Sequence, residues 1–214
     1  MIQGAIFDVD GTLLDSMSVW DTLAEDYLRT QHIEPHENLA ETFKTFSLQQ
    51  SAHYLQKAYG VSRSTKEIID GINRLVEQFY LEKAALKPYA AQALQRFYRQ
   101  SIPMCIATAT DEALVSGALR RCGVLDCFSK IFTCTSVGAS KNEPLIYRAA
   151  LEHLGTAKAA TWVFEDALHA AQTAKADGFP VVGVYDPAET HPSELKALAD
   201  FYIHDFSELS CLTL

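Results

Sequence analysis

The stretch Asp8-Val9-Asp10-Gly11-Thr12 follows directly after the apolar run Ala5-Ile6-Phe7. The run is typical of a buried strand, so two carboxylates separated by one residue stand where that strand ends. An Asp-Gly pair can also form an ordinary turn, and this alternative loses weight only when the rest of the chain is considered. Acidic groups at a buried strand end need a neutralising partner, and a divalent cation with oxygen ligands is the simplest one.

The composition is that of an ordinary globular protein, with 214 residues, 48% hydrophobic and 21% charged. The net charge of -9 argues against a nucleic-acid partner and against an anionic membrane surface. No apolar run is long enough to span a bilayer, and Met1 to Gly4 lacks the basic start of a signal peptide. The five cysteines form no CxxC pair and predict free thiols. We therefore expect a cytoplasmic protein, present as a monomer or a weak homo-oligomer.

The hydrophobic pattern divides the chain into two parts. Residues 15–86 show only helical spacing, with short helices expected at about 40–45 and 48–59 and a long one after Ser64. From Lys87 onwards strands and helices alternate, which predicts a parallel sheet with helices on both faces. Strands are expected at 102–108, 130–135, 161–164, 180–184 and 201–203, and helices at about 90–100, 112–122, 145–154 and 167–177.

The first strand belongs to the same sheet, so the helical part interrupts the α/β part. We therefore expect a Rossmann-like three-layer core formed by residues 1–14 and 87–214, with an all-helical cap domain, residues 15–86, inserted after the first strand.

Polar residues follow four of the predicted strands. In an open parallel sheet, ligands collect at the carboxyl ends of the strands, so these residues converge if the fold is as predicted. Taken singly, a lysine is usually a solvated surface charge and an acidic pair can simply begin a helix. The residues are Asp8 and Asp10 at the end of the first strand, Thr108 at the end of the second, Lys141 in the loop after the third, and Glu165 and Asp166 at the end of the fourth.

In their order along the chain, these residues resemble the four motifs of the haloacid dehalogenase superfamily. The resemblance covers nearly the whole chain and is closest to the β-phosphoglucomutase-like branch, whose small helical cap is inserted at the same place. Four positions depart from the usual pattern: Asn142 replaces a proline after the lysine, Ala167 replaces a serine, Ala170 replaces a later glycine, and Tyr89 replaces a glycine. None of these changes removes a catalytic group.

The resemblance implies a phosphotransferase that depends on Mg²⁺ and forms an aspartyl-phosphate on Asp8. It implies that Asp10 is the general acid and base, and that Lys141 and Thr108 bind the transferred phosphoryl group. The backbone N–H groups of Val9, Asp10 and Ala109 are the further phosphate donors expected. The implied metal ligands are Asp8, the carbonyl of Asp10, Asp166 and, through water, Glu165.

Several reactions occur within this superfamily. A dehalogenase is disfavoured because that branch does not carry the second acid, Asp10. A phosphonatase needs a cap lysine, and Lys44 in that region is more simply a surface charge. A mutase needs a histidine and an arginine where this chain has Trp20 and Leu48.

We therefore expect a phosphatase whose partner is a small phosphorylated metabolite, such as a sugar phosphate. A phosphosugar mutase is the first alternative, and a non-catalytic protein that binds a phosphometabolite or a protein partner is the second. The candidate substrate contacts in the cap are Lys44, Ser47 and His53.

Overall fold

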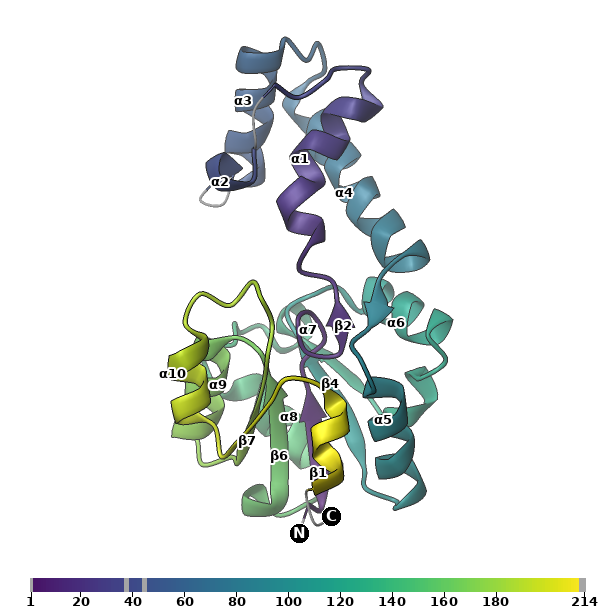
Figure 1. Ribbon diagram of the computed structural model, residues 1–214, viewed down its shortest axis with the longest axis vertical. Coiled ribbons are helices and arrows are strands. Elements are labelled where there is room, and N and C mark those ends of the chain that lie inside the picture. Colours follow the sequence, from purple (N-terminus) through teal and green to yellow (C-terminus); the bar gives the residue numbers. More distant parts are fainter. Residues whose placement is uncertain (1, 37–38, 44–45, 212–214) are drawn as a thin grey trace. The chain divides into compact units, whose positions relative to one another are not determined.

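The structure is a computed structural model that describes residues 2–36, 39–43 and 46–211 (Figure 1). The chain divides into two compact units, of which the first comprises Met1–Ser16 and Ala84–Leu214 and the second Met17–Lys83. The boundaries expected from the sequence lie two or three residues away from these. Within the described residues, no helix combines the length and the apolar character needed to cross a membrane.

The first unit is built on a six-stranded sheet in which all neighbouring strands are parallel. This arrangement confirms the predicted α/β fold. Gly4–Phe7 forms β1 at the centre of the sheet, which places the residues that follow it between two neighbouring strand ends. In spatial order the strands are β5 (Ile131–Thr133), β4 (Met104–Thr108), β1, β6 (Thr161–Glu165), β7 (Val181–Val184) and β8 (Phe201–Ile203).

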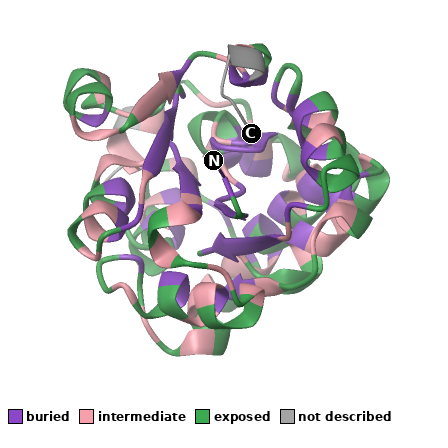
Figure 2. Cartoon of the chain, turned by 90° about the horizontal axis from the view of Figure 1, so that it is seen from below, coloured by how far each residue is buried: buried purple, intermediate pink, exposed green. Residues whose placement is uncertain are grey.

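Helices cover both faces of this sheet. One face packs its side chains against α8 (Leu145–Leu154), α9 (Leu168–Ala176) and α10 (Pro192–Leu198) in a single hydrophobic cluster that includes Ile6. On the other face, the ring of Phe7 lies beside that of Phe97 in α5 (Ala90–Arg99). Because neighbouring residues of a strand point to opposite faces, β1 contributes to both cores. Its four residues are all buried, and Figure 2 shows purple, buried strands enclosed by helices with exposed outer surfaces.

The described residues of the second unit form helices and loops only. The ring of Tyr27 in α1 (Val19–Thr30) lies against Gly71 in α4 (Thr65–Glu82), where any side chain larger than hydrogen would collide with it. Capping boxes begin both α4 and α3 (Leu48–Tyr59), which explains why these helices start where they do. The short α2 (Ala40–Phe43) completes the set.

Several elements differ from the prediction. The strand expected at 130–135 ends at Thr133, because the Thr133 side chain caps the following helix α7 (Cys134–Val137). Helix α10 was not predicted, and neither was the antiparallel pair β2 (Leu14–Asp15) and β3 (Ala85–Leu86). The remaining helices and turns of the first unit are α6 (Glu112–Arg121), η1 (Leu125–Cys127), η2 (Lys158–Ala160) and η3 (Phe206–Cys211).

Candidate active site

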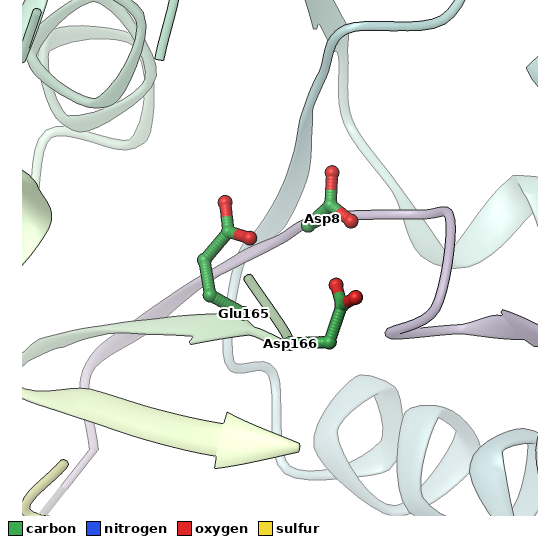
Figure 3. Close-up of side chains that lie close together, drawn as sticks. All are labelled: Asp8, Glu165 and Asp166. Carbon is green, nitrogen blue, oxygen red and sulfur yellow. The ribbon is translucent and has the colours of Figure 1, made fainter. Parts of the chain in front are cut away.

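Three buried carboxylates lie together at the carboxyl ends of β1 and β6 (Figure 3). The two strands are paired with Phe7 opposite Phe164, so Asp8 follows one strand beside Glu165 and Asp166 on the other. One oxygen of each carboxylate lies within 4.8 Å of the others. The parallel register therefore brings together acids that are more than 150 positions apart in the sequence.

Lys141 is the cation of this cluster. Its Nζ donates hydrogen bonds to Oδ1 of Asp8 and, over 2.7 Å, to Oε1 of Glu165, and all three side chains are buried. Burial alone would lower the pKa of Lys141, but the two carboxylates outweigh it and raise that pKa. The ammonium group is therefore charged at every physiological pH.

One ammonium group does not balance three carboxylates. Burial raises the pKa of Asp8 despite the opposing charge of Lys141. Burial also raises the pKa of Glu165 to about 7, and burial together with the charges of Asp8 and Glu165 raises that of Asp166 well above its ordinary value. These shifts reflect an unbalanced negative charge. A donor set made entirely of carboxylate oxygens fits Mg²⁺, which prefers such ligands.

Two neutral hydroxyl groups complete the cluster. Thr12 donates a hydrogen bond of 2.8 Å to Oδ1 of Asp166, and Tyr147 donates one of 2.7 Å to Oε1 of Glu165. Nothing in the sequence singles out Tyr147, because a tyrosine on the buried face of an amphipathic helix is usually a packing residue. Thr12 belongs to the first motif, and its hydroxyl links that motif to Asp166.

Asp10 lies next to the cluster and is only partly buried. Its Oδ1 accepts a hydrogen bond of 2.7 Å from Ser16, and its Oδ2 accepts one of 2.6 Å from Thr110. The turn that follows needs a glycine, since Gly11 has a φ of 77°. Both oxygens of Asp10 are thus held by hydroxyl groups, one from Ser16 after β2 and one from Thr110 after β4.

Thr108, the last residue of β4, is buried, and its hydroxyl oxygen accepts a hydrogen bond of 3.1 Å from the backbone N–H of Thr110. Thr110 also binds Asp10, so the end of β4 is tied to the end of β1. The backbone N–H of Val9 donates to the carboxylate of Asp8, and Ala109 is exposed directly after β4. The first unit therefore gathers all the candidate residues that were predicted at its strand ends.

The candidate substrate contacts of the cap belong to the second unit. Lys44 lies outside the described residues. Ser47 begins α3 as its N-cap and accepts a hydrogen bond from the backbone N–H of Gln50, which is a structural role. His53 is exposed on α3, with Nε2 3.5 Å from the hydroxyl of Thr65.

The second unit contains a pocket of about 410 Å³ between its helices. Half-exposed apolar side chains line it, among them Trp20, Phe46 and Leu48. Among the described residues of its lining, Asp21 is the one charged group, and it is an acid.

Comparisons with known proteins find similarity over most of the chain. A family model described as haloacid dehalogenase-like hydrolase matches residues 2–178. Hexitol phosphatase A of Escherichia coli is 27% identical over 190 residues, which cover 88% of this chain and 85% of that protein. A phosphoglycolate phosphatase of Rhodobacter capsulatus is 28% identical over 215 residues, covering 98% and 95%. The crystal structure of a β-phosphoglucomutase from Clostridium difficile shares the fold with a TM-score of 0.68 at 18% identity, covering 98% of this chain and 93% of that one.

Proposed function

The chain belongs to the family of haloacid dehalogenase-like hydrolases, and on that premise we propose that it is a magnesium-dependent phosphatase that forms an aspartyl-phosphate on Asp8. The predicted class of enzyme, a phosphatase of this family, is confirmed by the comparisons. The proposed substrate is a small phosphorylated metabolite, such as a sugar phosphate. The observation that carries the proposal is the direct contact of Lys141 with Asp8 inside a cluster of three buried carboxylates.

The residues that would hold the metal are Asp8, Asp166 and the backbone carbonyl of Asp10, with Glu165 acting through a water molecule. When bound, Mg²⁺ supplies positive charge between the carboxylate of Asp8 and the phosphate dianion, which otherwise repel each other. Lys141 supplies a second positive charge from the side of the cluster that it already occupies.

In the first step, an oxygen of Asp8 attacks the phosphorus atom and the bond from phosphorus to the substrate's bridging oxygen breaks. Asp10, in its protonated form, gives its proton to that leaving oxygen, so the product is an alcohol. Lys141 and the hydroxyl of Thr108 hold the oxygens of the phosphoryl group during the transfer. Asp8 then carries the phosphoryl group as an acyl phosphate.

In the second step, a water molecule attacks the phosphorus atom and Asp10 takes up its proton. The bond between phosphorus and the oxygen of Asp8 breaks, which releases inorganic phosphate and regenerates the free carboxylate. Asp10 is suited to both steps because Ser16 and Thr110 fix the orientation of its carboxylate without carrying a charge themselves.

The cap pocket supports a phosphatase over the mutase alternative. A mutase must bind a second phosphate in its cap, which requires cationic or strongly hydrogen-bonding side chains. Trp20 and Leu48 offer apolar surface in the pocket, and the carboxylate of Asp21 would repel a phosphate. We infer that the cap recognises an uncharged part of a substrate that carries a single phosphate.

The experiment that tests this function is phosphate release from a panel of phosphorylated sugars, nucleotides and small acids. The panel is measured with MgCl₂, with a chelator, and with an Asp8→Asn control. Release that requires magnesium and vanishes in the control would support the proposal and reveal the preferred substrate class. Magnesium binding without release from any compound would favour the non-catalytic alternative, and interconversion of phosphosugars without release would favour the mutase.

A further inference from the structure

The hydroxyl of Tyr147 is a buried polar group that the steps above leave unused. Tyr147 lies in the first turn of α8, six residues after Lys141, and its side chain is fully buried. Its hydroxyl lies 2.7 Å from Oε1 of Glu165 and 3.5 Å from the carbonyl oxygen of Ala170. The hydroxyl thus lies inside the carboxylate cluster rather than at a solvent-facing edge.

The position of this hydroxyl is fixed by the hydrophobic core. The ring of Tyr147 belongs to the cluster that joins α8 to the sheet, and its centroid lies 6.2 Å from that of Phe179. A buried ring within such packing has little freedom to move. The oxygen at its tip is therefore held at one place relative to the ends of β1 and β6.

Two donors meet at a single oxygen of Glu165. Oε1 accepts from the hydroxyl of Tyr147 and from Nζ of Lys141, each over 2.7 Å. The last torsion of a glutamate side chain is broad, so one hydrogen bond leaves the carboxylate free to rotate. Two donors from different directions define both its position and its plane.

The two donors differ in what else they must do. Lys141 also binds Asp8 and, during catalysis, would share its hydrogens with a phosphoryl group. Tyr147 serves Glu165 alone among the carboxylates of the cluster, and it adds no positive charge that would compete with a cation. It can therefore hold Glu165 while Lys141 changes partners.

We propose that Tyr147 is a positioning residue that holds Glu165 in the orientation in which the carboxylate cluster binds Mg²⁺. The inference rests on the magnesium dependence proposed above, and it assigns Tyr147 no contact with the substrate or the metal. Groups that orient metal ligands in this way typically change metal affinity by tenfold or more when they are removed.

The test is Tyr147→Phe, which keeps the ring and removes only the hydroxyl. Calorimetric titration of the metal-free, full-length protein with MgCl₂ should show affinity about tenfold weaker than in the wild type. Turnover should recover at saturating MgCl₂, because the catalytic groups remain. Tyr202→Phe is the matched control, since it removes the hydroxyl of a half-buried tyrosine on β8 in the same unit, and it should leave the affinity unchanged.

A double-variant cycle separates positioning from a general loss of stability. In a Glu165→Gln background, Tyr147→Phe should cause no further loss of magnesium affinity, because its effect passes through the Glu165 carboxylate. Wild-type affinity in Tyr147→Phe, or an equal loss in both backgrounds, would overturn the inference. A wild-type protein that binds no Mg²⁺ would overturn the proposed metal dependence itself, which this titration reveals before any variant is compared.

Discussion

The hydroxyl of Thr12 donates a hydrogen bond of 2.8 Å to Oδ1 of Asp166, although the two residues are 154 positions apart in the sequence. Both side chains are buried. The bond joins the loop after β1 to the end of β6, so the segments that carry the first and fourth motifs are linked directly. The position of Asp166 therefore depends on a residue of the first motif that has no catalytic group.

Thr12→Val should remove this bond while keeping the shape of the side chain. We expect a loss of about 1–2 kcal/mol in the free energy of unfolding, because a buried carboxylate loses a hydrogen-bond donor. Magnesium affinity should also fall, since Asp166 is a proposed ligand. Urea unfolding and a magnesium titration measure the two effects. Thr12→Ser retains the hydroxyl, so its stability and its magnesium affinity should stay close to those of the wild type. If Thr12→Val changes neither quantity, the hydrogen bond does not position Asp166.

Asp10→Asn should leave binding intact and disable proton transfer. Asparagine has nearly the same shape as aspartate, and the hydroxyls of Ser16 and Thr110 can still bond with it. It cannot give or take a proton, so kcat should fall by about 10²–10⁴-fold. Rapid-quench kinetics and phosphate-binding measurements would separate the two properties. Wild-type turnover in this variant would contradict the assignment of Asp10 as the general acid and base.

Residues at strand ends could be predicted, whereas residues that support them could not. Thr108 ends a predicted strand, and Asp8, Lys141 and Glu165 come after predicted strands. The parallel topology brings these strand ends together whatever conformation the loops adopt. The role of Tyr147 could not be predicted from the sequence, because a tyrosine on the core-facing side of a helix can serve packing alone or also donate a hydrogen bond. Its hydrogen bond to Glu165 depends on how α8 packs against the sheet, which local periodicity does not determine.

The same limit applies to the elements that were missed. β2 and β3 have two residues each, which is too short for an alternating pattern, and they pair across the whole of residues 16–84. Helix α10 spans only seven residues, of which Leu195 is the buried one. Short elements of this kind are decided by tertiary contacts rather than by local periodicity.

Removing one partner of the buried ion pair between Lys87 and Asp186 should strongly destabilise the first unit. Nζ of Lys87 lies 2.7 Å from Oδ2 of Asp186 and 2.6 Å from the carbonyl oxygen of Tyr185. Lys87→Met would leave a carboxylate buried without its partner, so we expect a loss of about 3–5 kcal/mol in the free energy of unfolding.

Chemical denaturation measures this loss, and a second substitution identifies its cause. In Lys87→Met with Asp186→Leu no charge remains buried at this place, so much of the stability should return. A double variant as unstable as Lys87→Met would show instead that the aliphatic stem of the lysine, and not the pair of charges, supports the fold.

Magnesium affinity should rise with pH across the neutral range. Burial, together with the charge of Asp8, raises the pKa of Glu165 to about 7 in the metal-free protein, against the opposing effect of Lys141 and the hydrogen bond from Tyr147. Below that pH the cluster holds a proton that Mg²⁺ must displace, so affinity should increase by up to about tenfold per pH unit from pH 5.5 and level off above 7. Titration of the protein with MgCl₂ at several pH values tests this.

The same proton governs the stability of the metal-free fold, and the sign follows from the raised pKa. An acid that binds its proton more tightly when folded stabilises the fold at low pH, and this stability is lost as the pH rises through about 7. Thermal unfolding in chelator should therefore show a decline between pH 5.5 and 8 that saturating MgCl₂ removes. Glu165→Gln should flatten the decline. Asp177→Asn is the control, because the hydrogen bond from Arg148 lowers the pKa of that carboxyl and its titration lies outside this range. A decline that persists unchanged in Glu165→Gln would mean that Asp8 or Asp166 holds the proton that Mg²⁺ displaces.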